Sequence, residues 1–595
     1  MAKNSINQDE KITSRSNSEI FLRLIKYLKP FKIKVFFIIF LMIIIMISGL
    51  LTPYLLKISI DKFIAGKNIK GLIITTLVVI AINFIGMLSS RISIIEMSKI
   101  TNKILLNIRQ ELYTHIQKLS FAFFDERPVG KILARVIGDV NSLAELFSSG
   151  VTTVIPQFLT VVCVAGLMFT MNVKLAVLAI IILPILCFTM FSIETISRKK
   201  WQIYRQKRSN MNGYTHEAFS GVRIIQDFTY EKTNSDKFGF SLKEMMDGFM
   251  KAIIYNDFFW PIVEVSWGIS TLIIFWYGTK FSQSKEISVG TIVAFISYSD
   301  MFWRPIINLA SYYNTLITNF AAAERIFDIM DVEPDIIDLE SAEIMPKIKG
   351  NVEFKNVTFG YEEGIPILKD ISFKIRQGEN IALVGPTGAG KTTITSLVSR
   401  FYDCDSGEVL IDGKNVKDVN LYSLRSQMGI MLQDTFLFSD TIKENIRYGK
   451  LDATDEEIIA AAKAVNAHEF IMKLEKGYDT EVNERGSRLS VGQRQLISFA
   501  RALLANPRIL ILDEATSNID TATEILVQRG INKLLKGRTS FVIAHRLSTI
   551  RDCDKIMVID DGKIIEAGTH DELMVKKGFY YGLYMAQYRF LNEGA

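Results

Sequence analysis

The pentapeptide LSVGQ occupies residues 489–493 and lies shortly before ILILDE at residues 509–514, an apolar run that ends in two acidic residues. Upstream, GPTGAGKTT at residues 385–393 follows directly on the apolar segment 381–384. A strand that runs into a glycine-rich loop, with a helix after it, is the setting in which such a loop binds phosphate. Together the three stretches predict an α/β nucleotide-binding domain in the C-terminal half of the chain.

These stretches carry side chains suited to ATP and Mg²⁺. Glycines let backbone N–H groups face the phosphates, and the following helix adds its positive N-terminal end. Lys391 can reach the β- and γ-phosphate oxygens, while Thr392 can offer its hydroxyl to the metal ion. Asp513 can hold Mg²⁺ through water, and Glu514 beside it can polarise the attacking water. We therefore expect an ATP-hydrolysing enzyme.

The N-terminal half is suited to a different solvent. Hydrophobic residues make up 49% of the 595 residues, and they gather in runs within the first half. Six of these runs are long enough to cross a bilayer as helices. They are residues 35–56, 71–90, 148–171, 173–192, 253–278 and 289–308. The predicted fold class is therefore a multidomain membrane protein, in which an all-α six-span transmembrane domain is fused to an α/β ATPase domain.

The connections between the apolar runs predict the topology. Those after the second and fourth runs, residues 91–147 and 193–251, are long and polar. The first thirty residues are polar and lack the pattern of a cleavable signal peptide, so we expect the chain to begin in the cytoplasm. With six spans, both long loops and the C-terminal half then lie inside the cell, and the protein is a multi-pass protein of the cytoplasmic membrane.

Four regions are expected along the chain. Ile20, Leu24 and Leu28 lie on one stripe of an amphipathic helix close to the N-terminus. Pro334 and Pro346 disfavour a long helix between the last apolar run and the nucleotide-binding domain, so this stretch is a linker. The N-terminal region, transmembrane domain, linker and nucleotide-binding domain span residues 1–30, 31–330, 331–350 and 351–595.

The net charge and the cysteine content exclude few classes of protein, and both have a simple explanation. The formal net charge of +6 is explained by Lys and Arg in cytoplasmic loops, so we expect no nucleic-acid partner. The four cysteines are scattered and show no spacing typical of metal ligands.

In combination, the motifs resemble those of ATP-binding cassette (ABC) exporters. The LSVGQ pentapeptide resembles the signature of that family, and the resemblance covers nearly the whole chain. The first long loop matches at Phe123, Phe124 and Asp125, with Gly130, Arg135 and Asp139 after them. The second loop matches at Glu217, Gly221, Ile225 and Phe228. The resemblance implies that a short helix in each loop docks on an ATPase domain; the alternative is a helical hairpin that only extends the bundle.

The resemblance also implies roles for single residues. Gln433 would contact Mg²⁺ and the water, His545 would sense the γ-phosphate, and Tyr361 would stack on adenine. Ser490 and Gly492 would contact the γ-phosphate of a partner subunit, so that each ATP lies between two chains. The implied catalytic residues are Glu514, His545 and Gln433, and the implied Mg²⁺ ligands are Thr392, Gln433 and Asp513. The implied ATP-binding residues are Tyr361, Gly385, Pro386, Thr387, Gly388, Ala389, Gly390, Lys391, Thr392, Thr393, Ser490, Gly492, Gln493 and Asp520.

Two positions depart from the family pattern. Val491 stands where the signature usually has glycine, and Asn518 stands where a small residue is common. Ser490 and Gly492 are intact. The departures leave two assemblies open: a homodimer, or a heterodimer in which one ATP site is weaker.

Charged residues within the apolar runs indicate a cavity or a pairing. Glu264 lies between Trp260 and Trp267, whereas Asp300 and Arg304 are spaced to pair on one helix face. A charge inside a membrane usually faces a cavity or a partner. Glu264 is therefore either a contact for cationic, amphipathic cargo or a structural pairing group.

The resemblance implies an ABC exporter half-transporter that works as a dimer. Its expected function is ATP-driven export of an amphipathic small molecule, lipid or peptide by alternating access. The alternatives are a lipid flippase of the same build and an ATP-gated regulator that transports nothing; Glu514 and His545 speak against the regulator, because a gate needs binding more than turnover.

Overall fold

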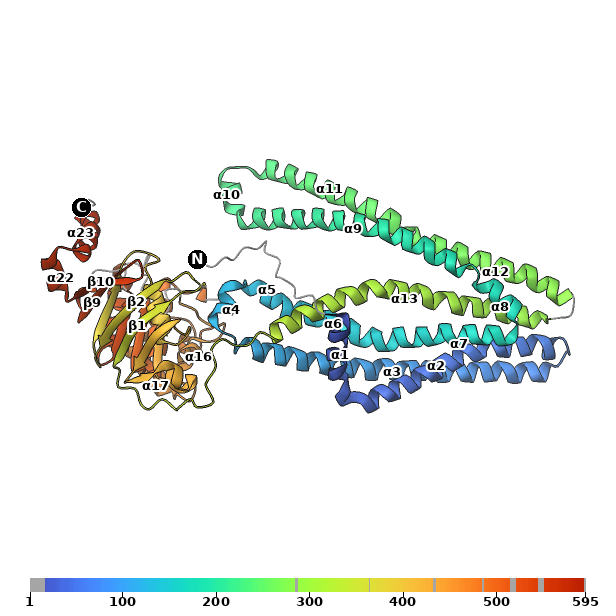
Figure 1. The fold of residues 1–595 in the computed structure, drawn as a ribbon, viewed down its shortest axis with the longest axis horizontal. Helices are drawn as coiled ribbons and strands as arrows, with labels where there is room; N and C mark the ends of the chain where they lie inside the picture. The colour runs from blue at the N-terminus through green and yellow to red at the C-terminus, as the bar shows by residue number, and fades with distance from the viewer. Residues whose placement is uncertain are drawn as a thin grey trace. The chain divides into compact units, whose positions relative to one another are not determined.

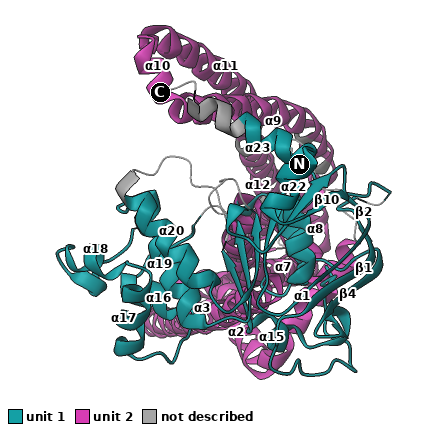
Figure 2. Ribbon diagram, turned by 90° about the vertical axis from the view of Figure 1, so that its left-hand side faces the viewer, with its two compact units in different colours: residues 1–7, 117–129, 332–595 teal, residues 8–116, 130–331 magenta. Residues whose placement is uncertain are grey.

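The computed structural model describes residues 16–283, 287–362, 364–431, 435–483, 486–513, 521–543 and 550–592. These residues form two compact units (Figure 2). The helical unit holds the described residues up to 116 together with residues 130–331. The nucleotide unit holds residues 117–129 and the described residues from 332 onward. Part of the first long loop thus belongs to the same compact unit as the C-terminal half.

The helical unit consists of long helices joined by short turns (Figure 1). Three segments, η2, η3 and η4, are wound as π-helix, and η1 is a 3₁₀ turn. The elements are α1 (Asn17–Leu28), η1 (Lys29–Phe31), α2 (Lys32–Ile58), η2 (Ser59–Ile64), α3 (Ile69–Ile116), α5 (Val129–Leu133), η3 (Ala134–Asp139), α6 (Val140–Ser149), η4 (Gly150–Val154), α7 (Ile155–Met171), α8 (Val173–Ile180), α9 (Leu183–Ser220), α10 (Val222–Asp227), α11 (Glu231–Asp257), α12 (Phe259–Gln283) and α13 (Val289–Met330).

Five helical stretches of the described chain are long and apolar enough to cross a membrane. They are Asn17–Ile64, Ile69–Ile116, Val129–Met171, Val173–Ser220 and Pro261–Gln283. The prediction of a helical membrane region is confirmed. The sixth predicted segment, residues 289–308, is helical within α13 but is not among these five, so its crossing of the bilayer stays a prediction.

Prolines correct the predicted boundaries of two spans. The run 173–192 is divided between α8, which ends at Ile180, and α9. The run 253–278 is divided between α11, which ends at Asp257, and α12. Each helix ends four residues before a proline, Pro184 or Pro261. The proline ring clashes with the carbonyl four residues earlier and removes a helical hydrogen bond. At these two positions the helix is interrupted, whereas α2 and α13 continue through Pro53 and Pro305.

The predicted amphipathic helix is present as α1. Ser16 caps its start, and Ile20 and Leu24 are buried. Arg23 donates two hydrogen bonds to the Asp331 carboxylate at the end of α13, with N–O distances of 2.7 and 2.8 Å. An Arg–carboxylate pair with two parallel bonds fixes orientation as well as distance, so α1 is held against the last long helix.

A second ion cluster joins the return arm of the first loop to α13. Asp139, buried at the end of the π-helical segment η3, accepts two hydrogen bonds from Arg325, at 2.6 and 2.9 Å. Arg135 donates a third bond to the same carboxylate, at 3.0 Å. A buried charge with several donors is held in place, because losing one partner leaves it unsatisfied.

The nucleotide unit contains two sheets and the helices around them (Figure 1). A six-stranded sheet has the order β10-β9-β3-β8-β7-β6, and a four-stranded antiparallel sheet has the order β2-β1-β4-β5. The strands are β1 (Val352–Phe359), β2 (Leu368–Ile375), β3 (Asn380–Val384), β4 (Ser406–Ile411), β5 (Lys414–Asn415), β6 (Met428–Met431), β7 (Ile509–Asp513), β8 (Thr539–Ile543), β9 (Lys555–Asp560) and β10 (Lys563–Gly568).

Helices of this unit pack around the sheets. They are α4 (Phe121–Glu126), α14 (Lys391–Val398), η5 (Val416–Asp418), α15 (Leu421–Arg425), α16 (Ile442–Arg447), α17 (Asp455–Ala464), α18 (His468–Met472), η6 (Gly477–Asp479), α19 (Val491–Ala505), α20 (Thr521–Leu535), α22 (His570–Lys576) and α23 (Phe579–Asn592).

The six-stranded sheet separates two hydrophobic cores. Ala382 and Val384 of β3 pack in one core, which includes residues of α16, α17 and α19. Ile381 and Leu383 of the same strand pack in the other core, with residues of β1 and β4. Successive residues of a strand point to opposite faces, and burial on both faces is the rule for parallel strands covered on each side.

Candidate nucleotide-binding site

Strand order places the predicted motifs at one edge of the six-stranded sheet. β3, β8, β7 and β6 are neighbours and run parallel. Leu383 near the end of β3 and Asp513 at the end of β7 both pair with Ile543 of β8, so they lie level across the sheet. In open α/β sheets, ligands bind outside the carboxyl ends of the strands. The phosphate-binding loop and Asp513 therefore meet at the edge where a nucleotide is expected.

Lys391 is held inside its own loop. It is 9% exposed, and its Nζ donates to the carbonyl oxygens of Gly385 and Pro386, at 2.7 and 2.8 Å. Burial lowers the pKa of Lys391, and the nearby Asp513 carboxylate opposes that shift. Sequence reasoning placed a cation and a carboxylate here for phosphate and Mg²⁺, and the structure brings the two residues close to each other.

Glycines shape the loop for two different reasons. Gly385 has φ +150°, and a Cβ there would lie 2.0 Å from the carbonyl oxygen of Ile559 on β9. Gly388 has φ +86°, but a Cβ there would meet no atom within 4 Å. Gly385 is thus required for packing, whereas Gly388 borders open space. A curled loop with a buried lysine and such a space beside it fits a bound triphosphate.

Thr392 and Thr393 lie in the first turn of α14 and have different surroundings. Thr392 is exposed, so its hydroxyl is accessible to a metal ion. Thr393 is buried, and its hydroxyl lies 3.2 Å from that of Tyr361. Tyr361 itself follows β1 and remains 49% exposed. The tyrosine predicted to stack on adenine is therefore joined directly to the helix that follows the phosphate-binding loop.

The signature begins α19. The Ser490 hydroxyl accepts a hydrogen bond from the Gln493 N–H at 3.2 Å, and the Gln493 side chain accepts one from the Ser490 N–H at 3.0 Å. This is a capping box. Because the hydroxyl oxygen acts as the acceptor, its proton is free to be donated to an anion. Gly492 is buried within α19.

The structure brings some predicted residues together and not others. The hydrogen bonds described for Ser490 and Gln493 stay within the start of α19 and do not reach the loop at residues 385–393. Gln433, Glu514, Asp520 and His545 lie outside the described residues, so their predicted roles stay predictions. β6 ends shortly before Gln433, β7 ends directly before Glu514, and β8 ends shortly before His545.

Comparison with known proteins identifies the family. Residues 35–306 match the profile described as ABC transporter transmembrane region, and residues 368–517 match the one described as ABC transporter. The chain is also 43% identical over 582 residues to the Bacillus subtilis protein named "Uncharacterized ABC transporter ATP-binding protein YknV", covering 98% of this chain and 96% of the relative. The chain belongs to the ABC transporter family. This transporter thus carries both a membrane region and an ATPase in one polypeptide.

Other relatives of this ABC transporter are named as exporters and flippases. An "ATP-dependent lipid A-core flippase" of Syntrophus aciditrophicus is 37% identical over 99% of this chain and 98% of its own. A "Putative multidrug export ATP-binding/permease protein YgaD" of Bacillus subtilis is 39% identical over 95% and 99%. The solved structure of a bacterial Atm1-family ABC exporter with ATP bound matches 94% of this chain and 98% of its own, with a TM-score of 0.78 and 28% identity.

These findings confirm several predictions. The transporter is a multi-pass membrane protein of the ABC exporter type, and it hydrolyses ATP to drive export. Half-transporters of this family are typically dimers in a lipid bilayer.

Sequence reasoning missed two side chains around the site. Arg494 donates to the carbonyl oxygens of Leu489 and Gly486, at 2.8 and 3.3 Å, and so holds the signature loop. Tyr402 contacts Tyr361 edge-on, with ring centroids 5.1 Å apart. Arg494 lies next to the signature and could have been suspected, whereas nothing in the local sequence around Tyr402 indicates its contact.

The two glycines of the loop should respond differently to the same substitution. We expect Gly385→Ala to lower the stability of the transporter by about 2–4 kcal/mol, because the Cβ collides with the β9 backbone. Gly388→Ala should lower it by only about 1 kcal/mol, the strain of a left-handed residue, but should weaken ATP binding at least about tenfold. Thermal unfolding and equilibrium ATP binding of the purified variants measure both. Equal melting temperatures, or unchanged ATP binding in Gly388→Ala, would contradict this division of roles.

Proposed function

We propose that this transporter uses Mg²⁺-bound ATP to move an amphipathic compound, lipid or drug-like, out of the cytoplasm across the cytoplasmic membrane. The proposal rests on one observation: the phosphate-binding loop that follows β3 and Asp513 at the end of β7 lie level at the carboxyl edge of the sheet, in a chain whose other unit contains long apolar helices. Relatives named for multidrug export and for lipid flipping support the amphipathic class of cargo. The ATPase unit then faces the cytoplasm.

The residues around the loop fit a magnesium ion. Thr392 offers an exposed hydroxyl beside Lys391, and Asp513 offers a carboxylate at the end of β7. When bound, Mg²⁺ neutralises charge on the phosphate oxygens and so favours phosphoryl transfer. Glu514 is proposed as the base that orients water, with Gln433 and His545 beside the γ-phosphate.

A second chain, identical or related, is the proposed partner. Ser490 is exposed, and its own cap uses the hydroxyl oxygen as an acceptor and does not need the hydroxyl proton. The tip of the second long loop, which includes α10, also carries apolar side chains that are exposed in the single chain. Ile224 and Phe228 are 64% and 74% exposed there. A partner subunit would cover both surfaces, since α10 would dock on its ATPase unit and Ser490 would complete its ATP site.

A flippase of the same build is the second candidate function. It would move its lipid between leaflets instead of releasing cargo into the medium. Inside-out vesicles separate the two, because export concentrates a soluble dye inside the vesicle, whereas flipping changes only the accessibility of a labelled lipid to a quencher.

Substitution of Glu514 tests the ATPase mechanism. Glu514→Gln should bind ATP normally but hydrolyse it about 100-fold more slowly or worse, because the water loses its base while the phosphate contacts remain. Lys391→Ala should instead weaken ATP binding about tenfold or more, because a charge-assisted contact is lost. Nucleotide trapping and turnover of the purified variants measure the difference. Near-normal hydrolysis by Glu514→Gln, or the same trapping in both variants, would overturn the two roles.

Mixed dimers test whether Ser490 serves the partner's site. The mixed dimer combines one Ser490→Arg chain with one Lys391→Ala chain. If each ATP site uses Lys391 of one chain and Ser490 of the other, both defects fall in one site and the other site is intact. We therefore expect each homodimer to trap no nucleotide and the mixed dimer to trap about half the wild-type amount. Two differently tagged chains, co-expressed and purified through both tags, allow the measurement. If Ser490 served its own chain's site, every mixed dimer would be as defective as the homodimers.

Glu264 is proposed as a contact for cationic cargo. It lies on α12, exposed in the single chain, three residues before Trp267 on the same helix face. Glu264→Gln should reduce stimulation of the ATPase by an amphipathic cation about threefold or more, and stimulation by a neutral compound much less, because only the cation loses an ionic contact. Asp257→Asn, an exposed acid at the end of α11, is the control. Equal loss for both compounds, or a drop in thermal stability, would identify Glu264 as a structural pairing group.

A further inference from the structure

Residues 117–129 of the first long loop pack on the nucleotide unit at one short turn. The ring centroids of Phe121 and Phe401 lie 4.4 Å apart. The Ser120 hydroxyl donates to the Asp335 carboxylate at 2.6 Å. The Tyr402 hydroxyl donates to the Asp125 carboxylate. The loop is therefore attached next to the end of α14, the helix that begins with Lys391.

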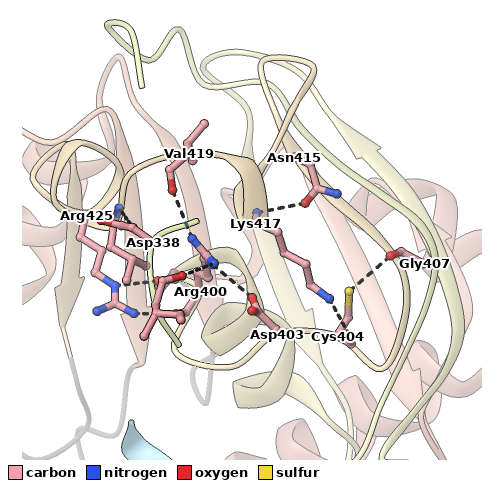
Figure 3. A network of polar contacts seen from close by, with 12 residues as sticks. Asp338, Arg400, Asp403, Cys404, Gly407, Asn415, Lys417, Val419 and Arg425 are labelled. Atoms are coloured by element: carbon pink, nitrogen blue, oxygen red, sulfur yellow. Dashed lines mark hydrogen bonds and ion pairs between the residues drawn. The ribbon is translucent and has the colours of Figure 1, made fainter. Parts of the chain in front are cut away.

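The turn that receives the loop is fixed by two arginines (Figure 3). Arg400 is 2% exposed and donates to the carbonyl oxygens of Ile337 and Val419, at 3.2 and 3.1 Å. Arg425 donates to the carbonyl oxygens of Ser399 and Arg400, at 3.1 and 2.5 Å. Carbonyls held by the buried Arg400 and the half-buried Arg425 leave the backbone little freedom. The aromatic side chains after Arg400 are thus presented from a rigid base.

Tyr402 connects this docking turn to the proposed adenine site. Its ring meets that of Tyr361 at 5.1 Å and 87°, a favourable edge-to-face geometry. The Tyr361 hydroxyl in turn lies 3.2 Å from that of Thr393. Burial and the bond to Asp125 raise the pKa of Tyr402, so its hydroxyl stays protonated as a donor. One continuous set of contacts runs from Asp125 to the first turn of α14.

We propose that Tyr402 is a positioning residue that transmits its own bond with Asp125, and not docking of residues 117–129 in general, to the ring of Tyr361, so that ATP affinity depends on Asp125. The inference rests on the proposed role of Tyr361 in stacking on adenine. The Tyr361 ring also meets the ring of Phe359, with centroids 5.1 Å apart. A ring packed on Tyr402 can shift when that neighbour shifts, and coupling of this kind travels through packed contacts. Because such coupling is reciprocal, ATP binding also strengthens the bond between Tyr402 and Asp125.

The test uses the full-length transporter in lipid nanodiscs. Asp125→Ala removes the acceptor, and Tyr402→Phe removes only the hydroxyl. Each should weaken equilibrium binding of ATP about fivefold, and the double variant should be no weaker than either single one, as expected for groups that act through one bond. Tripolyphosphate, which lacks the base, should bind all variants as it binds the wild type. Ser120→Ala removes another docking bond of the same loop and should leave ATP affinity unchanged.

Variants made in the Tyr361→Ala protein separate the adenine role of Tyr361 from the positioning role of Tyr402. There Asp125→Ala should cause no further loss of ATP affinity, because the ring that it positions is gone. If Tyr361→Ala binds ATP like the wild type, the adenine role fails and this inference fails with it. If Tyr361→Ala weakens ATP binding but Asp125→Ala and Tyr402→Phe do not, the adenine role stands and the inference is overturned. Equal loss of tripolyphosphate binding, or equal loss in Ser120→Ala, also overturns it, because either result indicates general damage to the loop.

Discussion

Parallel pairing of β3, β8 and β7 is the constraint on which the nucleotide unit depends. Ile543 of β8 pairs with Leu383 on one side and with Asp513 on the other, which sets the phosphate-binding loop level with the acidic strand end. A slip of one residue would exchange the two faces of a strand. Because both faces of β3 are buried in separate cores, such a slip would misplace apolar groups on each side. Core packing therefore holds Lys391 and Asp513 close enough for the carboxylate to influence the pKa of the lysine.

Much of the fold could be predicted because its signals are local in sequence. The loop at 385–393 contains the strand end, the glycines and the helix start in one stretch, and the apolar runs of the first half are unmistakable by length. The errors arose where hydropathy alone set the boundaries. Pro184 and Pro261 lie within apolar runs that look continuous, yet each ends a helix four residues before it. Hydropathy is an average over a window, whereas the clash of a proline ring is a property of a single residue.

The candidate site, like the fold, could be predicted where its signals are local in sequence. Ser490 and Gln493 show the spacing of a capping box, so the start of α19 could be read from the sequence. The contact between Tyr402 and Asp125 could not, because 277 positions separate the two residues and neither has a local pattern that indicates the other. The same holds for Arg400, whose guanidinium reaches the linker carbonyl of Ile337 across 63 positions. The resemblance implied that the first loop docks on an ATPase domain, but the residue pairs that make the contact are far apart in sequence, and only the fold reveals them.

The position of Val491 bears on the assembly. Val491 is the first residue of α19, and the reciprocal bonds of the cap run between Ser490 and Gln493, so the valine side chain takes no part in them. It is 37% exposed, and Gly492 beside it is buried within the helix. A β-branched residue is tolerated at this first helical position, because no preceding helical turn crowds its side chain. Replacing the usual glycine therefore leaves the hydroxyl proton of Ser490 available to an anion. Val491 therefore gives no structural reason to prefer a heterodimer with one weaker site over a homodimer, and both assemblies stay predictions.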